Sequence, residues 1–413
     1  MNDTATRARH KSQWVLNQVT DELNARPFPR FGVPTALFRL CLAGPEARAS
    51  LEALLSDHLP QIDWAGDAKL MRAERDGVHY NIEQHTEFVS LTLIDEKADG
   101  VSAARHLPDD WATRIAADIV VAVDCYCAAR AGTNRDSWSC ASRLEDGLAD
   151  VFFDFKVAED GHTKIALEFD AAANVRAIGR LALQVIEIET YRSFAALGLP
   201  QARDAQARLA DIAARVPADP LGKAPDEEGD AMRFGELSAL AAELEAIWRD
   251  TSFRFAACQA YWALVEARLG SLAETAFDNR IPIGGFLQRR LQPAIATYQS
   301  TERQRHNLAE QIGNMTTLLQ TRIELSLQRQ NADLLTSLNM AAARQLRLQH
   351  TVEGVSTVAI SYYLVSLLQY PTDWLLVRYP IFDDAFLRAG LVVLTVPLVW
   401  LAIRRLLRAS IRK

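Results

Sequence analysis

The pattern of apolar and polar residues changes twice along the 413-residue chain. Up to about residue 172, short alternating or apolar runs predict strands mixed with helices. The predicted strands cover 35–43, 79–82, 88–94 and 119–124, followed by a hairpin of 148–157 and 163–169. A helix is expected over 45–59, with a proline at its start. This pattern predicts an α/β domain over residues 1–172.

From Asn174 onward, apolar residues recur every three or four positions, which is the spacing of helices. Helices are expected from 175 to about 194, over 200–215 and over 231–276, within a helical region that spans 173–285. The acidic, proline-rich stretch 217–230 predicts a loop inside this region. The sequence therefore predicts a domain built mainly of helices after the α/β domain.

A long stalk helix is expected over 286–351, because no proline interrupts the run after Pro293. At 1.5 Å per residue, the uninterrupted run corresponds to roughly 86 Å of helix. Apolar residues repeat along it at spacings of three and four: Leu308, Ile312, Met315, Leu319, Ile323 and Leu327. This spacing is typical of a coiled coil between subunits and equally of an amphipathic helix packed within one subunit.

Two uncharged stretches near the carboxyl end predict a transmembrane hairpin over residues 352–413. Gly354–Thr372 has 19 residues without a charge, or roughly 28 Å of helix, and Ala389–Ile403 has 15. The aromatic residues between them are typical of a membrane interface. The expected fold class is α+β: an α/β cytoplasmic domain, then long helices, then the hairpin.

The charge distribution predicts the orientation of this hairpin. Residues 344–413 carry nine basic and four acidic residues, a charge of +5, which leaves −12 on residues 1–343 of the total −7. Basic residues flank both spans on their outer sides, so both termini are expected in the cytoplasm, with the hairpin in the membrane. The lipid bilayer is the predicted partner, and the acidic body disfavours nucleic acid.

Two groups of polar residues are candidate ion sites. His79, Glu83, His85 and Glu87 alternate as one face of a strand would, and these residue types bind divalent cations, although a structural or surface role would give the same pattern. Glu353, Ser356 and Thr357 share one face of the first span, with Gln369 near its outer end. That stripe would line a pore in a homo-oligomer, pack against another helix, or place Glu353 at the hydrated interface.

The sequence contains no motif for a reaction. It has no P-loop, no G-x-G-x-x-G and no G-x-S-x-G, and its five cysteines form no C-x-x-C pair. We therefore expect no enzyme and no cofactor apart from a possible divalent cation. A homo-oligomer is expected, and the sequence does not identify another protein partner. A scaffold, sensor or regulator is the first interpretation, and a membrane-tethered enzyme built on His79–Glu87 is a further alternative.

Several strings resemble one bacterial family along almost the whole chain and in the same order: NARPF (24–28), HTEF (85–88), EIETYR (187–192), SFRF (252–255), AYWALV (260–265) and QLRLQHTVEGVS (345–356). They are similar to the membrane-anchored proteins grouped as domain of unknown function 3422. The resemblance implies membrane anchoring and supplies no activity, substrate or catalytic residue. Together with the charge distribution, it predicts a multi-pass protein of a bacterial inner membrane with both termini in the cytoplasm.

The predicted architecture also looks like that of CorA-type magnesium transporters, which are homopentamers with the first span lining the pore. The departure lies at the outer end of that span, where CorA proteins carry Gly-Met-Asn and this chain has Leu367-Leu368-Gln369-Tyr370. A CorA-like cation channel or transporter without that filter is therefore the alternative function.

Overall fold

The computed structural model describes residues 28–64, 69–98, 100–130, 138–219, 221, 227–378 and 384–410. Their contacts divide the chain into two compact units. The first comprises Met1–Ala218 and Gly235–Met315, and the second comprises Asp219–Phe234 and Thr316–Lys413.

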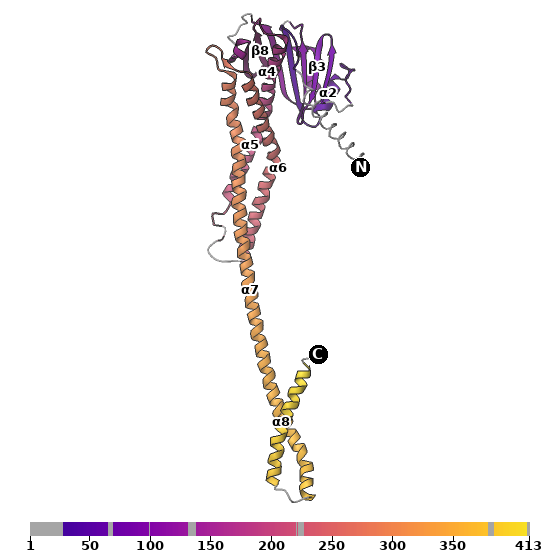
Figure 1. The fold of residues 1–413 in the computed structure, drawn as a ribbon, viewed down its shortest axis with the longest axis vertical. Helices are drawn as coiled ribbons and strands as arrows, with labels where there is room; N and C mark the ends of the chain where they lie inside the picture. The colour runs from indigo at the N-terminus through magenta and orange to yellow at the C-terminus, as the bar shows by residue number, and fades with distance from the viewer. Residues whose placement is uncertain are drawn as a thin grey trace, which may run out of the picture. The chain divides into compact units, whose positions relative to one another are not determined.

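The first unit is built on one mixed sheet of nine strands in the order β2-β3-β4-β1-β5-β8-β7-β6-β9 (Figure 1). Neighbouring strands are antiparallel except for β5 and β8, which are parallel. The strands are β1 (Thr35–Ala43), β2 (Leu70–Arg75), β3 (Val78–Gln84), β4 (Phe88–Asp95), β5 (Asp118–Ala129), β6 (Cys140–Leu144), β7 (Ala149–Val157), β8 (Thr163–Phe169) and β9 (Thr275–Ala276).

Each face of the sheet has its own covering. Helix α2 (Ala47–Leu55) packs Leu51 and Leu54 onto an apolar face that includes Phe38 and Leu40. Short elements complete this side: η1 (Ala103–His106) and α3 (Trp111–Arg114). The opposite face, with Cys125 and Val151 among its residues, forms a second core with the long helices. Because strand residues alternate between faces, β1 contributes to both cores.

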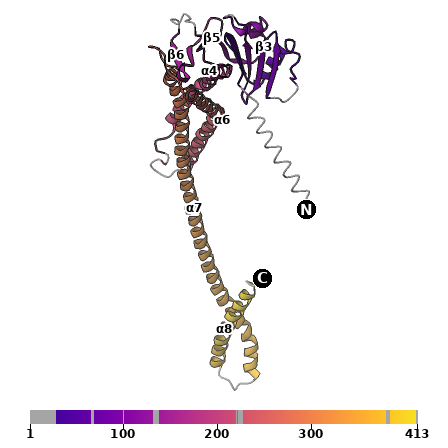
Figure 2. The same ribbon diagram turned by 45° about the horizontal axis from the view of Figure 1, so that its top comes forward.

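Four helices follow the sheet in the chain, and a fifth lies near the carboxyl end. They are α4 (Val175–Ala196), α5 (Leu199–Arg215), α6 (Glu227–Ser271), α7 (Ile283–Arg378) and α8 (Asp384–Ser410). Helix α4 begins at Asn174 because the Asn174 side chain accepts hydrogen bonds from the backbone N–H of Arg176 and Ala177. Figures 1 and 2 both show α4 next to the sheet.

Most of the predicted elements are confirmed. Strand β1 has the predicted bounds, and the hairpin of β7 and β8 starts and ends within one residue of the prediction. Helix α2 is shorter than expected and ends at Leu55, and α6 ends at Ser271 rather than 276. The apolar run over 119–124 predicts a buried strand, but in β5 buried residues alternate with more exposed ones.

The second unit contains the two helices that are long enough and apolar enough to cross a membrane. The apolar segments lie in α7 before Trp374 and in α8 over Ala385–Ile403. Only 11% of the apolar 18-residue stretch in each helix is buried. Both views show α8 beside the last turns of α7 (Figures 1 and 2). Asp373 of α7 and Arg388 of α8 form an ion pair of 3.2 Å, which joins the last turns of α7 to the first turns of α8.

Candidate functional site

A short segment that precedes the first strand forms one wall of a cavity. Residues 28–31, here called the strap, run from exposed Phe28 to buried Phe31 and lie against α4 at Gly179. A Cβ atom at Gly179 would sit 1.8 Å from the carbonyl oxygen of Pro29. Glycine costs helix stability, so its presence within α4 is explained by this close approach of the strap backbone.

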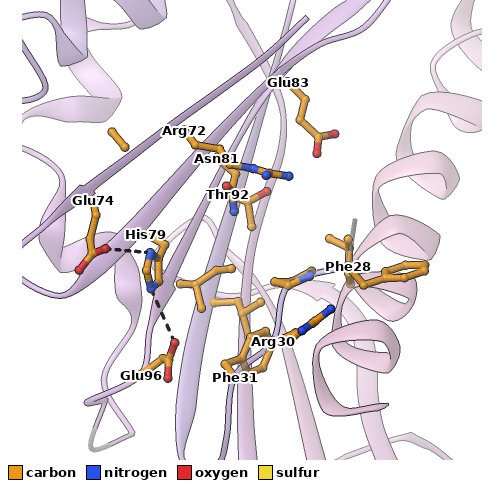
Figure 3. A pocket seen from close by; sticks show the side chains of 15 residues that line it. Phe28, Arg30, Phe31, Arg72, Glu74, His79, Asn81, Glu83, Thr92 and Glu96 are labelled. Carbon is orange, nitrogen blue, oxygen red and sulfur yellow. Dashed lines mark ion pairs between the residues drawn. The ribbon is translucent and has the colours of Figure 1, made fainter. Parts of the chain in front are cut away.

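The cavity lies between the strap and the sheet and has a volume of about 470 Å³. Strands β2, β3 and β4 provide most of its polar lining, and the strap and Leu183 of α4 provide an apolar part (Figure 3). The polar and charged lining residues are Arg30, Arg72, Glu74, His79, Asn81, Glu83, Thr92 and Glu96. Ligand sites of small molecules typically have this size and this mixture of walls.

The charges around the cavity are unevenly paired. His79 lies between two carboxylates, with Nδ1 3.6 Å from Glu74 and Nε2 3.7 Å from Glu96 (Figure 3). Arg30 and Arg72 are exposed, and the described part of the chain offers neither guanidinium a carboxylate within 4.0 Å. Two arginines therefore face one cavity with their hydrogen-bonding groups available.

A third arginine lies beneath the cavity floor. Arg39 is only 2% exposed, and its guanidinium donates to the Ser90 hydroxyl at 3.2 Å and to the Thr92 hydroxyl at 3.4 Å. Its Nε has no hydrogen-bond partner. Burial alone would lower the pKa of Arg39, but the nearby Cys41, Glu83 and Glu187 raise it above its ordinary value. Among the residues that the structure describes, Arg39 is therefore a buried cation without a carboxylate within 4.0 Å.

The four predicted metal ligands are divided between different environments. His79 and Glu83 line the cavity, as their alternation on β3 predicts. His85 stacks on Phe88, with ring centroids 4.1 Å apart, and lies 3.4 Å from Glu83. Glu87 pairs with Arg254 of α6 at 3.2 Å. The metal interpretation stays a prediction, and the contacts of Glu87 give it a role in holding α6 to the sheet.

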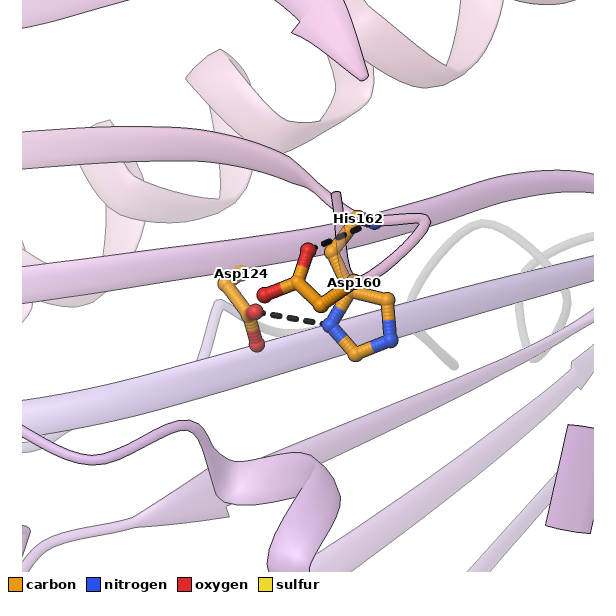
Figure 4. A group of neighbouring side chains, drawn as sticks. All are labelled: Asp124, Asp160 and His162. Atoms are coloured by element: carbon orange, nitrogen blue, oxygen red, sulfur yellow. Dashed lines mark hydrogen bonds and ion pairs between the residues drawn. The ribbon is translucent and has the colours of Figure 1, made fainter. Parts of the chain in front are cut away.

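The described residues contain one other cluster of metal-ligand types, which the sequence analysis did not single out: Asp124, Asp160 and His162 (Figure 4). His162 Nδ1 lies 2.8 Å from Asp124, whose other oxygen accepts from Ser102. Lys164 Nζ lies 2.5 Å from Asp160 and 4.0 Å from Asp124. Lys164 therefore already supplies a cation to both carboxylates.

The predicted pore stripe lies in the second unit. Thr357 is buried, as is Ser361 one turn further along α7, and on α8 Thr395 and Val399 are buried as well. A residue on a lone helix cannot be this well covered, so the stripe faces α8 within one chain. Ser356 is half-buried, Gln369 is exposed, and Glu353 pairs with His350 at 3.6 Å. Of the three interpretations, the stripe as a contact between helices accounts for this burial without a pore.

The sequence alone could not have found the cavity as a whole. Its alternation did single out His79 and Glu83. Arg72, however, lies on β2, whose sequence LMRAER has three charged residues and was not predicted to be a strand. Arg30 reaches the same cavity from the strap, more than forty residues away in the chain. Only the register of β2 with β3, which places Arg72 opposite Asn81, brings these groups together.

Comparison with known proteins places the chain in a family. No curated protein and no solved structure matches it, and the architectural likeness to CorA-type transporters stays a prediction from the sequence. One family model matches residues 15–410, which is nearly the entire chain and contains the cavity, the long helices and both apolar segments. The chain therefore belongs to the family described as protein of unknown function (DUF3422).

Proposed function

We propose that this chain is a membrane-anchored binding protein, a sensor or regulator, whose α/β unit binds a small anion in the strap cavity. One observation carries the proposal. Arg30 and Arg72 face the same cavity of about 470 Å³, and neither has a carboxylate partner in the described part of the chain. Arginine side chains that converge without internal partners are suited to bind carboxylate or phosphate groups.

The surroundings of the two arginines favour an anion over a cation. Asn81 and Thr92 add an amide and a hydroxyl next to Arg72 on the floor of the cavity (Figure 3). The buried charge of Arg39 lies directly behind Thr92. The cavity's carboxylates lie beside imidazoles, since Glu74 and Glu96 flank His79 and Glu83 lies beside His85, and these contacts become ion pairs when the histidines are protonated. The arginines are thus the groups left for a ligand.

The same lining favours binding over catalysis. The described lining residues include no serine, cysteine or lysine that would serve as a nucleophile. Phe28 and Phe31 provide apolar surface beside the polar floor, an arrangement that orients a ligand by a few polar contacts. A binding role needs no further group, so a sensor or regulator accounts for the site.

The second unit supports a location in the inner membrane of a bacterium. The apolar residues of α7 and α8 are largely exposed, as expected for side chains that contact lipid, and the two helices pack through their polar stripe. Basic residues precede the first span and follow the second, which supports a cytoplasmic position for both termini. The acidic remainder of the chain would then lie in the cytoplasm.

Thermal unfolding of the detergent-purified full chain tests the binding proposal. Inorganic phosphate and succinate are added separately, with sodium chloride at equal ionic strength as reference. At least one anion should raise the unfolding temperature of the α/β unit, and Arg72→Gln should abolish that rise. Arg203→Gln, on an exposed position of α5, is the matched control and should respond as the wild type does. Equal responses of the wild type and Arg72→Gln would overturn the proposal.

Membrane extraction tests the anchoring. The full chain should stay in the membrane pellet through an alkaline carbonate wash and leave it only with detergent. A chain that ends before residue 352 should lose this behaviour. Recovery of the intact full chain in the carbonate supernatant would rule out two membrane-crossing helices.

A further inference from the structure

We propose that residues 327–352 of α7 form a parallel, in-register coiled coil with the same segment of a second copy of the chain. This coiled coil does not depend on the anion site. Along α7, side chains change from buried to exposed toward the membrane-spanning segment. Leu319 is buried, whereas Leu334 and Leu338 are 61% and 64% exposed, and every residue from Leu327 to Val352 is exposed in the single chain.

The exposed segment has the apolar repeat of a coiled coil. Starting from Leu327, positions spaced alternately by four and three residues are occupied as follows: Leu327, Asn331, Leu334, Leu338, Ala341, Gln345, Leu348 and Val352. In heptad notation Asn331, Leu338, Gln345 and Val352 are at a, and Leu327, Leu334, Ala341 and Leu348 are at d. Six of these eight positions are apolar, and leucine dominates at d.

Charged residues avoid this seam. Between 327 and 352 they are Arg329, Asp333, Arg344 and Arg347, which take positions f, c, g and c. The positions beside the seam at e are Gln328, Leu335, Ala342 and Gln349, so no like charges meet across a parallel pair. An isolated helix gains no stability from an apolar seam in water, whereas a partner helix would bury it.

The identity of the partner follows from the two amides in the seam. Asn331 and Gln345 at a positions would be costly to bury against an apolar surface. In a parallel, in-register pair each lies opposite its own copy, and the two amides can hydrogen-bond to each other. A second copy of this chain therefore satisfies both polar positions at once.

The direction of the partner follows from the continuity of α7. The same spacing continues into the first apolar span, with Val355 and Tyr362 at d. A helix that covers the seam along its length must lie parallel to α7 up to the membrane. A second copy that carries the same hairpin does so, because its own α7 enters the bilayer at the same residue.

Disulfide crosslinking in native membranes tests the register. Ala341→Cys places a thiol in the seam at d, and Ala343→Cys, two residues further on the same helix, places it at f on the opposite side. The five native cysteines are buried and give little background. Under mild oxidation Ala341→Cys should form dimers at least fivefold faster than Ala343→Cys. Equal rates for the two variants would overturn the proposal.

The mass of the detergent-solubilised chain provides a second readout that does not depend on oxidation. Wild type should contain more than one copy. Leu334→Asp, at d, should dissociate into single chains, whereas Leu346→Asp, at b, should keep the wild-type mass. A wild type that is monomeric at every concentration, or an equal effect of the two aspartates, would contradict a seam at these positions.

Discussion

The two faces of strands β1 and β4 are equally buried but differ in chemistry. One face carries Phe38, Leu40 and Leu91 against helix α2, while the other carries Arg39, Ser90 and Thr92 beneath the strap cavity. Apolar side chains stabilise the fold when they are buried, whereas a buried cation without an ion-pair partner is costly. The second face also packs Cys41 and Phe88 into the core with the long helices, so the difference indicates that its polar residues under the cavity, and not the whole face, serve binding.

The largest effect is expected on the apolar face. Leu40 is fully buried in the core formed with α2. Leu40→Ala should lower the free energy of unfolding by about 2–5 kcal/mol, because it removes apolar contacts and leaves a cavity. Urea unfolding of the full chain in detergent measures this loss. A loss below about 1 kcal/mol would mean that this face does not carry the stability of the sheet.

This apolar face is also the part that the sequence predicts best. The run TALFRLCLA has alternating apolar residues and predicts β1 with its observed bounds, because one face of a half-apolar strand must be covered. The polar face could not be predicted in this way. Arg39 lies inside the predicted strand, but the order of residues along the chain does not indicate that residues 90 and 92 lie close to it. Nor does it indicate that the strap covers this face.

The long helix shows a second limit of sequence reasoning. The stalk helix was predicted over 286–351 and the first apolar span over 354–372, but one helix, α7, extends from Ile283 to Arg378 and includes Pro293 and Pro371. Proline removes one backbone donor and disfavours a helix locally, but the hydrogen bonds and packing of the surrounding turns can outweigh this cost. The apolar repeat predicted along this helix is only partly buried within one chain. Leu308, Ile312 and Leu319 are buried, whereas Leu327 is exposed.

The next-largest effect on stability is expected at the edge of the apolar face, where the contribution of a carboxylate depends on pH. The Asp95 carboxylate, 3% exposed, accepts from Arg105 at 2.8 Å and lies 2.7 Å from His106. Burial alone would raise the pKa of Asp95, but hydrogen bonds from His106, the Lys97 backbone and Arg105 lower it below its ordinary value of 3.8. This carboxylate therefore stabilises the fold above pH 3.8, and the contribution is lost as pH falls through the lowered pKa.

Asp95→Asn should cost about 1.5–3 kcal/mol at neutral pH, since it replaces charged hydrogen bonds by neutral ones. Its stability should then depend less on pH below about 4 than that of the wild type. Acid titrations of both proteins at a fixed urea concentration measure the difference. Asp57→Asn, at an exposed position, is the control and should keep the wild-type profile. Parallel profiles for all three proteins would contradict a stabilising role of Asp95.

A smaller effect is expected where the strap meets α4. Alanine at an exposed helical glycine stabilises by about 0.5–1 kcal/mol, and Gly235→Ala in α6, with nothing within 4 Å of the added Cβ, should show this gain. Gly179→Ala should instead lose about 1 kcal/mol, because its Cβ would displace Pro29. The anion response in thermal unfolding should also fall, because Arg30 moves with the strap. A gain equal to that of Gly235→Ala would show that the strap does not lie on α4.

The smallest change in stability is expected at Arg39. A substitution there distinguishes most clearly between a structural and a binding role of the polar face. Glu187 pairs with Arg268 at 2.6 Å and Glu83 lies beside His85, so both nearby carboxylates keep a basic neighbour without Arg39. Arg39→Met should therefore leave the free energy of unfolding unchanged or raise it by up to about 1 kcal/mol. The affinity for phosphate or succinate should nevertheless fall roughly threefold to tenfold, because a cation behind Thr92 is lost. Arg39→Lys, which keeps the charge, should retain most of the affinity. A loss of several kcal/mol in Arg39→Met with unchanged affinity would make the polar face a structural element like its apolar counterpart.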